Sequence, residues 1–255
     1  MIRIAAILLC LLPGCRPAKA DTVAVAVAAN FRSTLTALQP LFTARTGHHL
    51  RLSSGSTGKL YAQITRGAPW QVFLAADRQT AERLVREERG THLRIYARGR
   101  LVLWNKNAGK DLRRLVRGDS HRIALASPTA APYGRAARTW LENQQIPGIA
   151  ARSGRLLYGE NVGQVMQFAM VDDRVIALVA HAQVLSLPRG KQGSVHIPAA
   201  SASPGIDQAA VLLPRGRGQK AAAAFLAFLL SPGAQDLIAE KGYGRGDPPP
   251  AAKGD

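Results

Sequence analysis

Small polar residues follow two predicted strands near the start of the chain, at positions where they could bind an anion. Asn30 follows the β-branched run 22–28 after one alanine, and residues 53–60 (SSGSTGKL) follow the strand-like segment 49–53. Each position also suits a simple helix N-cap, which is the alternative interpretation. However, ligands in open α/β sheets bind at the carboxyl ends of parallel strands, where helix N-termini present N–H groups. The two segments together therefore favour an anion site.

No set of residues points to catalysis or to a bound metal cation. Residues 53–60 begin with serine where a nucleotide phosphate loop needs glycine, and end in leucine where that loop carries a hydroxyl. Residues 55–58 (GSTG) are one residue short of a nucleophile elbow. Of six histidines only His48 and His49 are adjacent, with no acidic partner at ligand spacing, and two cysteines cannot form a four-cysteine site. We predict no enzyme, no catalytic residues, no cofactor and no direct metal ligands.

The rest of the chain alternates short apolar strands with helical patterns. Strands are predicted over 22–28, 49–53, 72–76, 100–104, 122–126, 156–158, 175–180, 195–198 and 209–213, and helices over 57–66, 80–88, 134–143, 162–170 and 219–230. A further helix carries Phe31, Leu35, Leu38 and Phe42 on one face, ends at Gly47 and is expected to kink at Pro40. This order is typical of mostly parallel sheets covered by helices.

The first twenty residues have the features of an export signal. A positive start precedes the apolar run 4–12, and residues 18–20 (AKA) fit a small-x-small cleavage site. The run is too short to span a bilayer, which takes about 20 apolar residues. We predict cleavage after Ala20 and a periplasmic protein. Residues 12–15 (LPGC) resemble a lipoprotein processing box with an ill-fitting proline, so a lipid anchor at Cys15 is the alternative.

The chain is strongly basic. Thirty-four Lys and Arg against 16 Asp and Glu give a net charge of +18, and loss of Arg3, Arg16 and Lys19 with the signal leaves +15. Such a charge favours an anionic partner, either a small ion or an anionic polymer or surface. Aromatic residues make up only 5%, which argues against a stacking platform for nucleic acid. Salt dependence separates the alternatives, because binding by surface charge weakens steeply with salt.

Six segments, in this order, resemble the periplasmic molybdate-binding proteins, the solute receptors of molybdate ABC importers. They are 25–31 (VAVAANF), 53–77 (SSGSTGKLYAQITRGAPWQVFLAAD), 96–104 (YARGRLVLW), 127–137 (SPTAAPYGRAA), 159–168 (GENVGQVMQF) and 231–244 (SPGAQDLIAEKGYG). The resemblance implies a two-lobed α/β binding protein (type II-like), with a mostly parallel sheet in each lobe and the ligand in the cleft between them. It also implies a monomer that binds molybdate, or tungstate, and delivers it to the membrane permease of an ABC importer. The expected limits are 21–99 and 208–245 for lobe 1, 100–207 for lobe 2, and 246–255 for a disordered tail.

The resemblance also implies the residues that contact the ion. Asn30 and Thr57 are expected to bind it from the first lobe, and Tyr133 and the backbone N–H of Val162 from the second. Ala180 stands where some members of the family have a tyrosine, and the hydroxyl of Tyr133 could replace it.

The chemistry of molybdate agrees with this residue set. Molybdate at neutral pH only accepts hydrogen bonds, so its site needs donors and no inward carboxylate. Phosphate keeps a proton and would call for a buried acceptor. Sulfate remains the nearest rival, to be decided by the size of the cleft.

Overall fold

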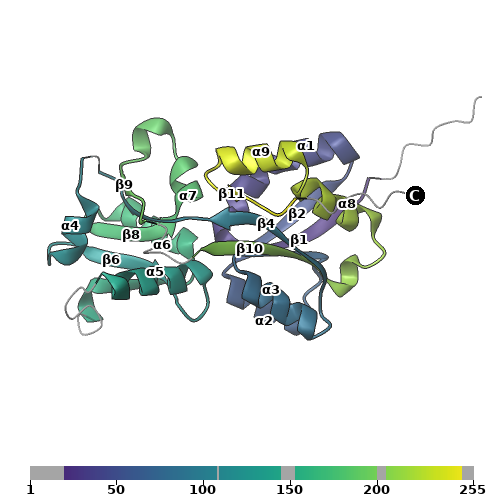
Figure 1. The fold of residues 1–255 in the computed structure, drawn as a ribbon, viewed down its shortest axis with the longest axis horizontal. Helices are drawn as coiled ribbons and strands as arrows, with labels where there is room; N and C mark the ends of the chain where they lie inside the picture. The colour runs from purple at the N-terminus through teal and green to yellow at the C-terminus, as the bar shows by residue number, and fades with distance from the viewer. Residues whose placement is uncertain (1–19, 108, 145–152, 200–204, 249–255) are drawn as a thin grey trace, which may run out of the picture.

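Two β-sheets covered by helices form two lobes, joined by the strands that pass between them (Figure 1). The computed structural model describes residues 20–107, 109–144, 153–199 and 205–248. The signal segment 1–19 and residues 249–255 of the predicted tail lie outside the described residues.

The first sheet has six strands in the order β11-β4-β10-β3-β1-β2. Its strands are β1 (Thr22–Ala28), β2 (His49–Gly55), β3 (Val72–Ala75), β4 (Thr91–Gly99), β10 (Ile206–Leu212) and β11 (Gly244–Arg245). The helices of this lobe are η1 (Ala29–Phe31), α1 (Arg32–Thr46), α2 (Thr57–Thr65), α3 (Arg78–Arg86), η5 (Pro214–Gly216), α8 (Lys220–Leu229) and α9 (Pro232–Glu240).

Side-chain alternation along β1 explains why helices cover both faces of this sheet. Val23, Val25 and Val27 pack with α1, α8 and α9 on one face, whereas Ala26 packs with α2 and α3 on the other. In Figure 1, α1 and α9 lie above the sheet and α2 and α3 below it. A strand segment buried on both faces must be apolar throughout, and residues 23–28 (VAVAVA) meet this requirement.

The second sheet has five strands in the order β7-β6-β8-β5-β9. Its strands are β5 (Leu101–Asn105), β6 (Arg122–Ala126), β7 (Leu156–Gly159), β8 (Val175–Ala180) and β9 (Ser194–His196). The helices are α4 (Leu112–Arg117), α5 (Pro132–Asn143), η2 (Ser153–Arg155), α6 (Val162–Val171), α7 (His181–Leu185) and η3 (Arg189–Lys191). One continuous core joins this sheet to α4, α5, α6 and α7.

Both sheets are mixed, which refines the predicted fold class. β1 runs parallel to β2 and β3, and β6 runs parallel to β7 and β8. β4 and β10, the strands that lead to and from the second lobe, pair antiparallel, with Ile206 opposite Gly99. β5 likewise runs antiparallel to β8 and β9. The two-lobed α/β class is confirmed. In each sheet the parallel strands lie at one end, and the antiparallel strands include those that connect the lobes.

Several elements differ from the sequence-based expectation. β4, β11, α4, α7 and α9 were not predicted, and α1 continues through Pro40 to Thr46. Part of the predicted tail is bonded, since the N–H groups of Gly246 and Asp247 donate to Gln235 and Ile95. The first sheet draws on residues 22–99 and 206–245 and the second on 101–196, while the exact limits of the lobes stay a prediction.

Candidate functional site

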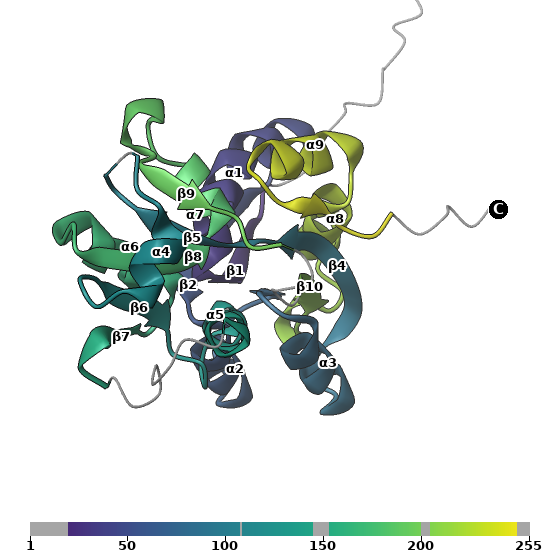
Figure 2. The same ribbon diagram turned by 60° about the vertical axis from the view of Figure 1, so that its left-hand side comes forward.

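Five segments, three from the first lobe and two from the second, meet in a pocket between the lobes. It is lined by Ala28, Ala29, Asn30, Gly55, Ser56, Thr57, Ala76, Ala131, Pro132, Tyr133, Asn161 and Val162. All four predicted contact residues are therefore brought together, and none of the described residues lining the pocket is charged. Figure 2 shows α2 and α5 close together, and the N–H of Gly58 in α2 donates to the carbonyl of Ala130 just before α5, at 2.9 Å.

The topology of the two sheets explains this meeting. β1 and β2 lead into η1 and α2, whereas β6 and β7 lead into α5 and α6. Within each lobe these strands are parallel, so their carboxyl ends lie at the same edge and the helices after them begin there. The first N–H groups of each helix have no partner within that helix and carry the positive end of its dipole. The pocket is thus surrounded by donors.

Thr57 is held with its hydroxyl hydrogen available. It is 1% exposed, and its Oγ1 accepts a hydrogen bond from the backbone N–H of Ala76 at 3.0 Å. A hydroxyl oxygen that accepts this bond can still donate its own hydrogen. The side chain is therefore fixed by its own lobe and can donate into the pocket.

Ser56 is a candidate contact that the sequence did not single out. It occupies the N-cap position of α2 without making a side-chain cap bond. Its Oγ is buried and has no hydrogen-bond partner, although Ser56 lines the pocket. An unpartnered buried hydroxyl costs about 1–3 kcal/mol, so a ligand that accepts from it would remove that cost. A serine at the start of a helix ordinarily acts as its N-cap, so the sequence pattern around Ser56 did not predict a ligand contact.

Val162 can donate through its backbone because its neighbour caps the helix. The Oδ1 of Asn161 accepts from the N–H groups of Gly163 and Gln164, at 2.9 and 3.2 Å. These bonds use the second and third N–H groups of α6 and not the first, which belongs to Val162, a residue that lines the pocket. Gln183 supports this turn by donating to the carbonyl of Val162 at 3.2 Å.

Asn30 lines the pocket, but its side-chain donors are already used. Its Nδ2 donates to Oε1 of Gln208 at 2.8 Å and to the hydroxyl of Tyr243 at 3.2 Å. Tyr243 in turn donates to the carbonyl of Asn30 at 2.8 Å. The side chain of Asn30 is therefore not a helix cap and anchors the start of η1 to the sheet beneath it.

Tyr133 is the second lobe's side-chain donor. It is 2% exposed, and its hydroxyl is buried without a hydrogen-bond partner. Burial raises the pKa of the Tyr133 phenol well above its ordinary value, and the nearby phenols of Tyr243 and Tyr96 raise it further. The phenol therefore keeps its hydrogen throughout the physiological pH range and can act only as a neutral donor or acceptor.

Ala180, the position where some relatives were expected to have tyrosine, does not line the pocket. It is fully buried at the end of β8, and its N–H donates to Oε1 of Gln183 at 3.2 Å. Among the described lining residues, Tyr133 is the second lobe's only side chain with a hydroxyl.

The lobes are closed on each other in this structure. The pocket has a volume of about 10 Å³, roughly the space for one water molecule. Two ion pairs cross between the lobes near it, Lys59 with Glu160 at 3.1 Å and Arg135 with Asp77. A tetrahedral oxyanion is much larger than a water molecule, so its admission requires the lobes to move apart.

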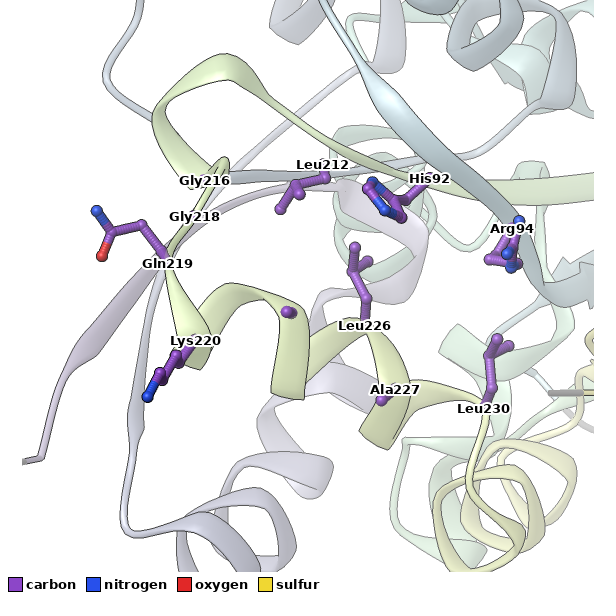
Figure 3. A pocket seen from close by; sticks show the side chains of 11 residues that line it. His92, Arg94, Leu212, Gly216, Gly218, Gln219, Lys220, Leu226, Ala227 and Leu230 are labelled. Atoms are coloured by element: carbon purple, nitrogen blue, oxygen red, sulfur yellow. The ribbon is translucent and has the colours of Figure 1, made fainter. Parts of the chain in front are cut away.

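A much larger cavity lies elsewhere, on the outer side of the first lobe. It has a volume of about 560 Å³ between β4, β10 and α8, and Figure 3 shows Leu212, Leu226 and Leu230 around it, with His92 and Arg94 on β4. Its lining is largely apolar, with Arg94 and Lys220 at opposite ends in Figure 3, so it lacks the converging donors that the several acceptor oxygens of a small dianion require. The small donor-lined pocket is therefore the better anion site despite its size.

Clustered metal ligands or a membrane-spanning helix in the described residues would point to a different function. Among them no group of three or more His, Cys, Asp or Glu is arranged to hold a metal ion. Within the same described part no single helix is long and apolar enough to cross a membrane; α8 and α9 pass that test only as a pair bent by 56°.

A donor-lined cleft between two α/β lobes is the architecture of a solute receptor. The chain belongs to the bacterial extracellular solute-binding protein family, whose model matches residues 23–244. It is 37% identical over 235 residues to the molybdate-binding protein ModA of Rhodobacter capsulatus, covering 89% of this chain and 90% of that protein. ModA of Azotobacter vinelandii is 36% identical over 234 residues, with 89% and 91% covered. The predicted resemblance is confirmed, and the family is one of solute receptors, not of enzymes.

Solved structures agree with this assignment. The periplasmic molybdate-binding protein of Azotobacter vinelandii superposes with a TM-score of 0.81 at 31% identity, covering 87% of this chain and 98% of that one. The sulfate-binding protein SubI of Mycobacterium tuberculosis superposes with a TM-score of 0.69 at 17% identity, which shows a shared fold alone.

Proposed function

We propose that this chain is a periplasmic receptor that binds molybdate, and tungstate equally, and delivers it to the permease of an ABC importer. The observation that carries the proposal is the uncharged, donor-rich pocket between the lobes, in a chain 36–37% identical to two molybdate-binding proteins. Molybdenum enters as the oxyanion, so no side chain binds the metal directly. The receptor acts as a monomer and does not bind nucleic acid.

Five groups in the pocket are proposed to contact the oxyanion. The first lobe supplies the hydroxyls of Thr57 and Ser56 and the backbone N–H of Asn30, whose amide hydrogens are used by Gln208 and Tyr243. The second lobe supplies the hydroxyl of Tyr133 and the backbone N–H of Val162. Neutral donors avoid the desolvation cost of burying an ion pair.

The donor set also favours a fully deprotonated anion. A protonated phosphate would need an inward acceptor, and among the described lining residues there is no carboxylate to provide one. Sulfate is the remaining alternative, because it has the same charge and shape and differs in size.

Isothermal titration calorimetry with the mature chain tests the proposal. Molybdate and tungstate should each bind at one ion per chain with similar affinity, and sulfate and phosphate at least about 100-fold more weakly. Tight binding of sulfate with weak binding of molybdate would establish the alternative oxyanion receptor. Absence of binding for all four ions, while an anionic polymer binds in a strongly salt-dependent manner, would replace the proposal with a surface-charge function.

A further inference from the structure

Gln208 is a buried glutamine directly beneath the pocket, on a strand that leads back from the second lobe. It is fully buried in β10, where the pairing with β4 shifts register between Gln208 and Ala209. Its Oε1 accepts two hydrogen bonds, from Nδ2 of Asn30 at 2.8 Å and from the hydroxyl of Tyr96 at 3.0 Å. One end of the amide is therefore committed to holding Asn30, which lines the pocket.

The other end of the amide has no partner. Nε2 of Gln208 is buried and makes no hydrogen bond, and the same is true of the hydroxyl of Tyr133, which comes from the opposite lobe. Both groups lie against Gly99, the last residue of β4: a Cβ there would be 2.9 Å from Nε2 and 2.1 Å from the Tyr133 oxygen. Two groups with unmet hydrogen-bonding capacity thus converge where the lobes connect, in a space that exists because residue 99 lacks a side chain.

We propose that Gln208 is a positioning residue that orients Tyr133 for the bound oxyanion, an inference that rests on the proposed function. A phenol that gives its single hydrogen to a ligand oxygen keeps lone pairs free to accept. The N–H of Gln208 supplies the matching donor once a bound ligand draws the two groups, which already lie close to Gly99, into hydrogen-bonding range. The chain of bonds then runs from the ligand through Tyr133 and Gln208 to Asn30, and such chains strengthen one another in a buried setting.

Gly99 sets the geometry of this connection. The lobes are linked at this residue, because β4 ends at Gly99 and β5 begins at Leu101. A methyl group at position 99 would occupy the place of the Tyr133 hydroxyl and keep the second lobe from closing fully. Gly99 leaves room for the Tyr133 hydroxyl, and Gln208 donates a hydrogen bond to it. Together they favour the closed arrangement in which Tyr133 contacts the ligand.

A double-mutant cycle with a matched control tests the inference. Gln208→Leu should weaken molybdate binding about tenfold in the parent, but less than about threefold in the Tyr133→Phe background, because the two residues act through one bond. The control is Gln235→Leu, a buried glutamine of the same lobe whose Nε2 donates to the carbonyls of Tyr96 and Leu229, away from the pocket. It should lower the melting temperature and leave affinity within about twofold.

The outcomes are distinguishable. Equal losses for Gln208→Leu in both backgrounds, or an unchanged affinity, would overturn the inference while leaving the proposed function intact. If neither the parent nor the Gln235→Leu control binds molybdate, the proposed function itself fails and the inference falls with it.

If the Gln208→Leu variant does not fold, the Gly99→Ala variant tests the inference instead. It should weaken binding at least about tenfold, and removal of the hydroxyl in Tyr133→Phe should recover part of that loss. Gly233→Ala is the control, since a Cβ there meets no atom within 4 Å. An affinity of Gly99→Ala equal to that of Gly233→Ala would overturn the inference.

Discussion

The residues of each lobe that line the pocket form its two walls. Both walls present hydrogen-bond donors, but these donors are held in place differently. In the proposed site, the donors of the first lobe include a side chain fixed within that lobe, Thr57, whose hydroxyl is held by the N–H of Ala76. On the second lobe the donors are the backbone N–H of Val162, freed by the Asn161 cap, and the hydroxyl of Tyr133. The Thr57 hydroxyl is thus held by its own lobe, whereas the Tyr133 hydroxyl comes from the second lobe and lies against Gly99 of the first in this closed structure. We therefore expect Tyr133 to reach this place only when the lobes close. Substitutions on the first wall should therefore weaken ligand binding both before and after closure. Substitutions of Tyr133 should weaken it only in the closed complex.

Thr57→Val should produce the largest loss and tests the first wall. Valine has nearly the same shape but cannot donate to the ligand or accept from Ala76. A bond to a charged acceptor is worth about 1.5–3 kcal/mol, and the freed N–H adds to the cost, so we expect roughly 100-fold weaker molybdate binding by calorimetry. Thr57→Ser keeps the hydroxyl and should stay within about fivefold. Equal affinities for the valine and serine variants would remove Thr57 from the site.

Tyr133→Phe tests the wall that depends on closure. Loss of the phenol hydroxyl should weaken binding roughly 10- to 100-fold. This loss should appear as faster dissociation of the closed complex. Tyr61→Phe is the matched control, because that hydroxyl bonds the surface carboxylate of Glu87. If the Tyr133 variant binds within about twofold of the parent, its hydroxyl packs at the hinge and does not touch the ligand.

Ser56→Ala sharpens the comparison by removing the unpartnered hydroxyl of the first wall. We expect about tenfold weaker molybdate binding, and an unliganded melting temperature that is unchanged or slightly higher, because a buried oxygen without a partner is lost. Differential scanning calorimetry with and without molybdate measures both effects. A clear fall in the melting temperature of the unliganded protein would mean that Ser56 has a structural partner and is not waiting for a ligand.

Lys59→Gln should have the smallest effect, since the Lys59–Glu160 pair joins the walls at an exposed position. Its side chains are 55% and 46% exposed, and exposed pairs contribute only about 0–1 kcal/mol. We expect less than about threefold change in affinity, through faster dissociation in stopped-flow experiments. Arg138→Gln removes the same charge from a pair within α5, so it should slow association equally and leave dissociation unchanged. Identical dissociation rates for the two variants would show that the pair does not hold the lobes together.

The strands and helices with strong local patterns could be predicted from the sequence, and the connections between lobes could not. Runs such as 23–28 and 175–180 are buried on both faces and are therefore apolar throughout. β4 escaped prediction because its first half mixes charged and apolar residues, and because it leads almost directly into β5. Of these two consecutive strands, only β5 is apolar enough to carry a clear strand pattern.

The same distinction applies to the site. Asn30, Thr57, Tyr133 and Val162 could be proposed because they lie in motifs that resemble those of the molybdate-binding proteins, and Asn30 and Thr57 also stand at helix starts that follow strands. The bond between Asn30 and Gln208 joins positions 178 residues apart, so no local pattern could indicate it. Because this bond uses a hydrogen of the Asn30 amide, the group of Asn30 that we propose to contact the ligand is its backbone N–H and not its side chain.

A crystal structure with molybdate, with molybdenum located by its anomalous scattering, tests the central claim most directly. We expect one molybdenum per chain between the two walls, with its oxygens within hydrogen-bonding distance of Thr57, Tyr133 and the N–H of Val162. Molybdenum bound instead at a cationic surface such as Arg113, Arg114 and Arg117 on α4, with the pocket between the lobes unchanged, would contradict the account.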